Sequence, residues 1–65
     1  MKRLASSNLA AYDYDPADRI LTIMFQSGRS YRYKDVPQEI AEGLETAPSP
    51  GRYFNSEIKG IFAEG

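Results

Sequence analysis

Residues 20–34, ILTIMFQSGRSYRYK, contain two runs of strand character and the turn between them. The first run, residues 20–26, is rich in β-branched and aromatic residues and is too short for a good helix. The second run, residues 30–34, alternates its two tyrosines with polar or basic residues. The stretch therefore predicts a β-hairpin.

Two loops can close this hairpin, and they place the side chains differently. A three-residue loop over 26–28, with Gly28 in the left-handed region, sets Phe25 opposite Arg29. A two-residue loop shifts the pairing by one residue and turns Arg32 toward the apolar side chains, where an unpaired charge costs several kcal/mol. We therefore expect the three-residue loop. One face of the hairpin then carries Leu21, Ile23, Phe25, Tyr31 and Tyr33, and the other carries Thr22, Met24, Ser30, Arg32 and Lys34.

The flanking segments supply one further strand and two helices. Residues 8–15 predict a weaker strand that ends in an Asp15-Pro16 turn. A helix over 37–47 is capped by Asp35, or by Val36 if Pro37 is its first residue. Its Gly43 weakens the helix or permits close approach to the sheet.

A second helix begins with Ser49 as N-cap and Pro50 as first residue, and Gly60 ends it. After it, residues 61–62 dock on the sheet or add a short strand, and we expect the last three residues to be frayed.

The predicted fold is α+β: a three-stranded antiparallel meander with two short helices on one face, in the order β-β-β-α-α. The chain forms a single domain over residues 1–65, with an ordered core of about 6–62. We expect the core to contain Leu21, Ile23, Phe25, Tyr31, Tyr33, Ile40, Leu44, Phe54 and Ile58, with Leu9 and Tyr12 as further candidates.

Composition excludes several kinds of chemistry. The chain has no cysteine and no histidine, so a Cys/His zinc site and Ser–His or Cys–His catalysis cannot form within it. The acidic residues Asp13, Asp15 and Asp18 match a turn better than a metal site. No apolar run is long enough to cross a membrane, and no secretory signal is recognisable. We expect a cytoplasmic protein without catalytic residues, metal, cofactor, enzymatic activity or membrane partner, and a monomer or weak dimer.

Two groups of residues are candidates for binding nucleic acid. The first is basic and follows the 30–34 strand: Arg29, Arg32 and Lys34. The second is the SPGR turn, where Ser49, Gly51 and Arg52 could receive a phosphate at a helix N-terminus. We expect a nucleic acid to join the two groups. The net charge of −1 argues against a strong non-specific grip on phosphates.

Five motifs follow one another along the chain: Ser6-Ser7, Tyr14-Asp15-Pro16, Tyr31-Arg32-Tyr33, Val36-Pro37 and the stretch from Ala47 to Asn55. In this order they resemble the KTSC domain, a family named for its occurrence at the C-terminus of some lysyl-tRNA synthetases. The resemblance covers nearly the whole chain, and free-standing bacterial members have about this length. The synthetase context of the family implies contact with RNA.

We therefore expect a non-enzymatic binding module that contacts RNA or another nucleic acid weakly. The alternative is a protein–protein interaction module that uses an exposed sheet edge or the Thr22/Met24 face.

Overall fold

In the computed structural model, which describes residues 1–64, the central hairpin has the register that the three-residue loop predicts. Strand β3 (Ile20–Phe25) pairs antiparallel with β4 (Ser30–Tyr33), and Ile23 lies opposite Tyr31. The Phe25 N–H donates to the Arg29 carbonyl at 2.8 Å, and Gly28 has a φ of 95°. Gly28 takes this left-handed conformation without the steric penalty that a Cβ would bring.

The sheet has four strands rather than the predicted three. Strand β2 (Leu9–Asp15) pairs with β3, and a two-residue strand, β1 (Lys2–Arg3), adds to the outer edge of β2 in the order β1-β2-β3-β4. Leu4, which precedes the expected ordered core, is buried, and its N–H donates to the Ala10 carbonyl at 3.0 Å. Two charged residues carry no apolar alternation, so nothing local in the sequence indicates β1.

A bulge in β2 brings both Leu9 and Tyr12 to the core. Leu9 lies opposite Phe25 and Tyr12 opposite Ile23, and the register shifts between Leu9 and Ala11. Without the extra residue, positions three apart would point to opposite faces of the sheet. Leu9 and Tyr12 are buried, which confirms both of these core candidates.

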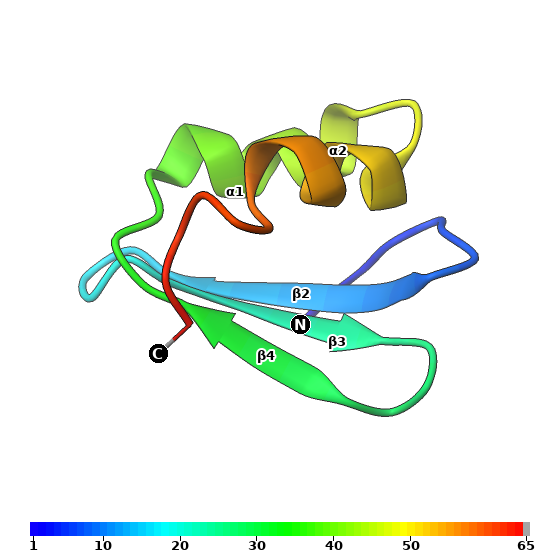
Figure 1. Ribbon diagram of the computed structural model, residues 1–65, viewed down its shortest axis with the longest axis horizontal. Helices are drawn as coiled ribbons and strands as arrows, with labels where there is room; N and C mark the ends of the chain where they lie inside the picture. Colours follow the sequence, from blue (N-terminus) through cyan, green and yellow to red (C-terminus); the bar gives the residue numbers. More distant parts are fainter. Residues whose placement is uncertain (65) are drawn as a thin grey trace.

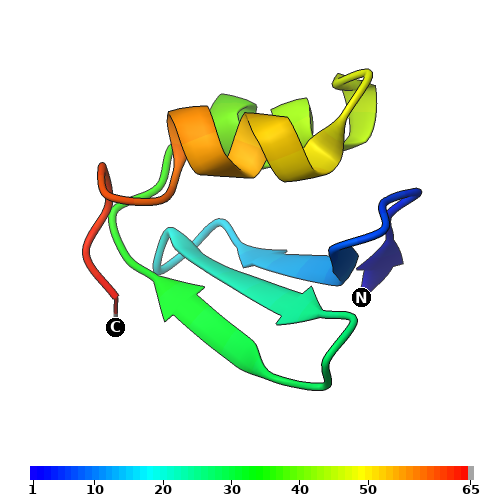
Figure 2. The same ribbon diagram turned by 45° about the vertical axis from the view of Figure 1, so that its right-hand side comes forward.

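Helices α1 (Gln38–Thr46) and α2 (Pro50–Glu57) both cover the same face of the sheet and leave the other face open (Figure 1). The view in Figure 2 shows the same two layers from another side. Ser49 caps α2 by accepting the Arg52 N–H at 3.4 Å, and Pro50 opens that helix, as predicted. Gly60, just beyond the helix, has the expected positive φ of 81°.

The start of α1 differs from both predicted caps. Its N-cap is Pro37, with extended backbone and no side-chain cap, so neither Asp35 nor Val36 has that role. Asp35 instead has a φ of 60°, and this left-handed residue turns Val36 into the core, where it is fully buried. The Tyr14 hydroxyl donates to the Val36 carbonyl at 2.5 Å, and the Val36 N–H donates to the Arg19 carbonyl at 3.0 Å.

The buried core lies between the sheet and the helices. It includes the predicted Leu21, Ile23, Tyr33, Leu44, Phe54 and Ile58. Phe25, Tyr31 and Ile40 pack against this core but stay half-exposed. Leu4 and Val36 are further members that the sequence did not indicate.

Gly43 permits a close approach of the two helices rather than of helix and sheet. A Cβ at this position would overlap the hydroxyl end of the Tyr53 ring. The ring crosses α1 there, and the Tyr53 hydroxyl donates to the Ile40 carbonyl at 2.8 Å. The glycine therefore makes room for a tyrosine of α2.

The segment after α2 folds back onto the edge of β4. Phe62 is half-buried against the core, the Lys34 N–H donates to the Ala63 carbonyl at 3.0 Å, and Tyr33 forms an isolated antiparallel bridge with Glu64. Phe62 thus docks on the sheet, one of the two alternatives predicted for residues 61–62, whereas Ile61 is exposed. Ala63 and Glu64 were expected to be frayed, which is wrong, because Ala63 accepts the Lys34 N–H and Glu64 pairs with Tyr33. Gly65, which belonged to the expected frayed end, lies outside the described residues.

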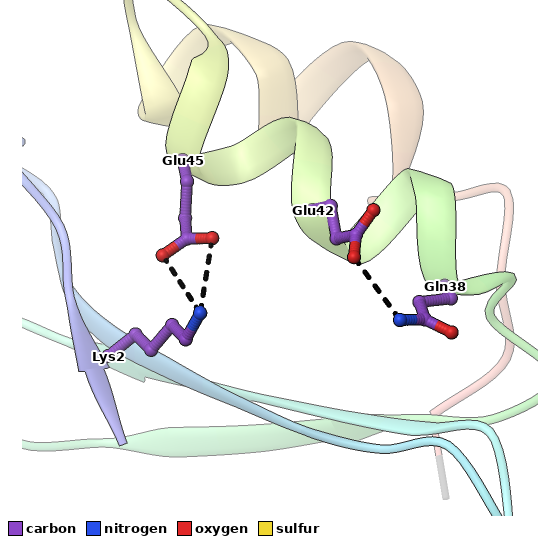
Figure 3. A network of polar contacts seen from close by, with 4 residues as sticks. All are labelled: Lys2, Gln38, Glu42 and Glu45. Carbon is purple, nitrogen blue, oxygen red and sulfur yellow. Dashed lines mark hydrogen bonds and ion pairs between the residues drawn. The ribbon is translucent and has the colours of Figure 1, made fainter.

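At the other edge of the sheet, Lys2 of β1 reaches α1 (Figure 3). Its Nζ lies 3.4 Å from Glu45 Oε1 in an exposed ion pair. Pairs of this kind contribute at most about 1 kcal/mol, so β1 depends mainly on its pairing with β2 and on Leu4. No helix within residues 1–64 is long and apolar enough to cross a membrane.

Truncation of the two β4 tyrosines should separate a fully buried side chain from a half-buried one. We expect Tyr33→Ala to lower the free energy of unfolding by about 3 kcal/mol, because this residue is only 4% exposed. The half-exposed Tyr31 should contribute less, about 1–2 kcal/mol on truncation to alanine. Urea denaturation measures both, with Arg32→Ala as an exposed control that should change stability by less than about 0.5 kcal/mol. Equal losses for Arg32 and Tyr33 would contradict the observed register.

Substitution of Gly43 tests the contact between the helices. Alanine is a better helix former by up to about 1 kcal/mol, yet Gly43→Ala should destabilise the protein because the methyl group displaces the Tyr53 ring. In a Tyr53→Ala background the same substitution should become stabilising. A thermal-unfolding double-mutant cycle measures the coupling, and additive effects would show that the two residues do not compete for space.

Candidate functional site

An open groove of about 540 Å³ lies on the helix side of the molecule, where β4 meets α2 and the segment that follows it. Its size falls within the range of about 300–1,000 Å³ that is typical of ligand sites. The β-hairpin, α2 and the C-terminal segment each contribute to its walls. The lining residues are Asn8, Phe25, Ser27, Arg29, Tyr31, Tyr33, Phe54, Asn55, Lys59, Gly60, Phe62 and Glu64.

Aromatic rings form the apolar part of the groove and hold one another in place. Phe25 packs edge-on against both Tyr31 and Phe54, with ring centroids 5.5 Å apart in each pair. Tyr33 packs against Phe54 in the same manner at 5.7 Å. Edge-to-face pairs at these distances are favourable beyond the area they bury. Since Phe25 and Tyr31 are half-exposed, part of this preformed aromatic surface is open to a ligand.

Two cations and one carboxylate line the same groove. Arg29, in the position opposite Phe25, and Lys59, beyond the end of α2, are exposed, and Glu64 contributes the opposite charge. Burial raises the pKa of Tyr33, and the Glu64 carboxylate and then Tyr31 add to this. The Tyr33 phenol is therefore neutral at physiological pH. An arrangement of aromatic faces flanked by cations can bind a planar group that carries negative charge.

The structure divides the predicted basic group between two surfaces. Arg29 lies in the groove with the aromatic rings. Arg32 pairs with Thr22 and is exposed on the face of the sheet that no helix covers. Lys34 is exposed just beyond β4, where its N–H bonds the C-terminal segment.

The SPGR turn lies in the helix layer, away from Arg32. Ser49 Oγ already accepts the Arg52 N–H, and the Gly51 backbone approaches Ser6, whose Oγ would lie 3.5 Å from a Cβ at this position. Arg52 is exposed at the start of α2. The expected union of this turn with the Arg32/Lys34 strand therefore does not occur on one continuous surface.

Sequence reasoning missed most of the groove. Phe25 and Tyr31 were predicted as core alone, and Asn8 and Asn55 had no expected role at the site. One signal was present: the register that sets Phe25 opposite Arg29 also places Arg29 on the tyrosine face. The walls of the groove that α2 and the C-terminal segment form depend on tertiary packing, so no local pattern in the sequence indicates them.

The acidic residues near the β2–β3 connection form a turn. Asp15 Oδ1 accepts the N–H groups of Ala17 at 3.0 Å and Asp18 at 3.3 Å, as the turn interpretation predicts. Over the part of the chain that the structure describes, no cluster of three or more acidic, histidine or cysteine side chains could hold a metal ion.

The antiparallel sheet, the two helices on one of its faces and the groove at its edge define a small α+β domain. The chain belongs to the KTSC domain family, whose model matches residues 5–62. This confirms the resemblance seen in the sequence. The chain is also similar to the crystal structure of a KTSC domain protein from Yersinia pestis, with a TM-score of 0.93 and 34% identity over 98% of this chain and 90% of that one.

Relatives include both free-standing and embedded domains. An uncharacterized protein of Stutzerimonas stutzeri is 48% identical over 61 residues, which are 91% of this chain and 86% of that protein. A lysine–tRNA ligase of Nostoc sp. is 46% identical over 56 residues, which are 86% of this chain but 10% of the ligase. The family thus occurs by itself and as a small part of a larger enzyme.

Tyr12 of β2 is buried away from the groove, near the acidic residues Glu42 and Glu45 of α1. Figure 3 shows two of these carboxylates, Glu42 and Glu45, on the side of α1 that faces the sheet and β1. Burial is the main cause that raises the pKa of Tyr12 to about 12, and Glu45 and Glu42 add to it. The phenol is thus held in its neutral form.

This raised pKa predicts a loss of stability in alkali. A free phenol titrates near pH 10, so the stabilisation of the neutral form is complete below pH 10 and is lost as the pH rises through about 12. At about 1.4 kcal/mol for each pKa unit, Tyr12 accounts for about 2–3 kcal/mol. Urea denaturation between pH 9 and pH 12 should show a weaker pH dependence for Tyr12→Phe than for the wild type. Identical pH profiles would show that the phenol ionises as easily in the folded as in the unfolded chain.

Proposed function

We propose that this protein is a non-catalytic binding module that holds a short segment of single-stranded RNA in the aromatic groove. The observation that carries the proposal is the presence, in one preformed groove, of half-exposed aromatic rings beside Arg29 and Lys59. A base would lie against Tyr31 and Phe25, and the two cations would contact the flanking phosphates. The lack of cysteine is compatible with the cytoplasmic location expected from the sequence.

The aromatic surface supports a single strand rather than a duplex. Bases in a duplex are stacked on one another, whereas a splayed base exposes a face that can stack on an aromatic ring. Such stacking contributes about 1–3 kcal/mol per base and tolerates any base. Phe25 fixes Tyr31 by an edge-to-face contact, so little conformational freedom is lost when a base is bound.

The charges support weak and salt-dependent binding. The groove is lined by two cations, Arg29 and Lys59, and by one carboxylate, Glu64. The whole chain has a net charge of −1. Two phosphate contacts on a single strand predict a slope of about −1.4 for the logarithm of the binding constant against that of the salt concentration. Affinity should therefore fall about sevenfold between 50 and 200 mM salt.

The relatives support an RNA ligand as well. The protein of Nostoc sp. that carries this domain is a lysine–tRNA ligase. Weak RNA contact by an appended module would increase the local concentration of RNA near such an enzyme. We extend the same ligand class to this chain.

The test is a chemical-shift titration of the labelled protein with single-stranded hexanucleotides and a matched RNA duplex, at 50 and 200 mM salt. We expect the single strands to shift the amide signals around Phe25, Tyr31 and Asn55. Arg29→Ala/Lys59→Ala should weaken binding at least fivefold and flatten the salt dependence. The matched control, Arg32→Ala/Lys34→Ala, removes the same number of charges outside the groove and should leave binding within twofold.

Two results would overturn the proposal. One is that no amide signal changes its chemical shift at millimolar concentrations of any of the oligonucleotides. The other is an equal loss of affinity in the control variant, which would show that binding follows total charge rather than the groove.

A further inference from the structure

The uncovered face of the sheet carries acidic, apolar and basic side chains in separate columns. Rows across the face follow from the strand register, in which Asp13 lies opposite Thr22 and Thr22 lies opposite Arg32. The rows from β2 through β3 to β4 are Ala11–Met24–Ser30 and Asp13–Thr22–Arg32, followed by Asp15–Ile20 with Lys34 one residue past the end of β4. Acidic groups therefore lie on one side of an apolar column and basic groups on the other.

These charges have no partners of the opposite sign within the described molecule. Among residues 1–64 the only ion pair joins Lys2 and Glu45, on the helix side. Asp13 and Arg32 are exposed, while Thr22 between them and Met24 in the next row are half-exposed. Arg3 of β1 lies opposite Ala11 at the margin of this face, outside the acidic and basic columns.

We propose that this face binds the same face of a second copy of the chain, with the two-fold axis running along β3. Rotation about this axis leaves each row at the same height along the strands. It places the β2 end of each row over the β4 end of the same row in the other copy. Asp13 of one copy then meets Arg32 of its partner, and the reciprocal pair forms at the same time because a two-fold interface is isologous. Ile20, Thr22 and Met24 meet their own counterparts at the centre. Aligned packing of two sheets is a common arrangement, and it covers the apolar column.

The charge pattern distinguishes this arrangement from its main competitor. A two-fold axis perpendicular to the strands, also in the plane of the interface, would place β2 over β2 and β4 over β4. Asp13 would then face Asp13, and Arg32 would face Arg32, which is unfavourable. Only the axis along β3 makes the face complementary to itself.

The size of the molecule predicts that the dimer is weak. Its dimensions are 28 × 22 × 21 Å. One face therefore offers about 600 Å² at most, and the total buried area stays near the lower end of specific interfaces, at about 1,200 Å². Since the groove lies on the helix side, dimerisation through the open face leaves it accessible in both copies.

Charge reversal tests the proposal by comparing the wild type with two single variants and their mixture. Asp13→Arg and Arg32→Asp each create two like-charged contacts in a homodimer. In an equimolar mixture, the arginine introduced in one variant meets the aspartate introduced in the other, and the native Asp13 and Arg32 form the second contact. Sedimentation equilibrium at 50 mM salt, from about 10 µM to 1 mM protein, measures self-association in each sample, and amide spectra verify that the exposed substitutions leave the fold intact.

We expect the wild type to dimerise toward 1 mM, each single variant to associate at least tenfold more weakly, and the mixture to recover wild-type association. A wild type that is monomeric at 1 mM would overturn the proposal and assign this face to a different protein or to solvent. Single variants that associate as well as the wild type, or a mixture that stays monomeric, would overturn it too.

Discussion

The turn over residues 26–28 sets the pairing of β3 with β4, and the core, the groove and the open face all follow from that pairing. The hydrogen bond from the Phe25 N–H to the Arg29 carbonyl closes a three-residue loop, and Gly28 supplies the positive φ that this loop requires. A loop shorter by one residue would exchange the two faces of β4 relative to β3. The tyrosines would then point away from the helices, and the groove, the core and the separated charges of the open face would all be lost.

The same register gives the two tyrosines of β4 different roles. Tyr33 lies under α2 and is almost fully buried, whereas Tyr31, two residues earlier, extends past the end of the covered area and remains half-exposed. One strand thus contributes both to the core and to the groove. A binding surface built from rings that are themselves packed against the core needs little ordering when a ligand arrives.

Local chemistry in the sequence was enough to predict the hairpin register, the Ser49 cap, the left-handed Gly60 and most of the core. Each of these follows from residues close together in the chain. The strand β1, the buried Val36 and the left-handed Asp35 were not predictable, because they depend on partners far away in sequence. The candidate site was predicted only through Arg29, since the remaining walls come from α2 and the segment after it. Basic residues that follow one another along β4 do not form one patch, because alternation along a strand divides them between two surfaces.

The backbone of Val36 joins three parts of the chain by hydrogen bonds. Its carbonyl is bound by the Tyr14 hydroxyl of β2, and its N–H is bound to Arg19 in the β2–β3 turn. Arg19 and Asp35 both adopt left-handed conformations to make this possible. The β2–β3 turn and the segment that leads into α1 therefore open together, so this end of the molecule behaves as one cooperative unit in local unfolding. Chain insertions that are harmless in an ordinary surface loop would here disconnect the helix layer from the sheet.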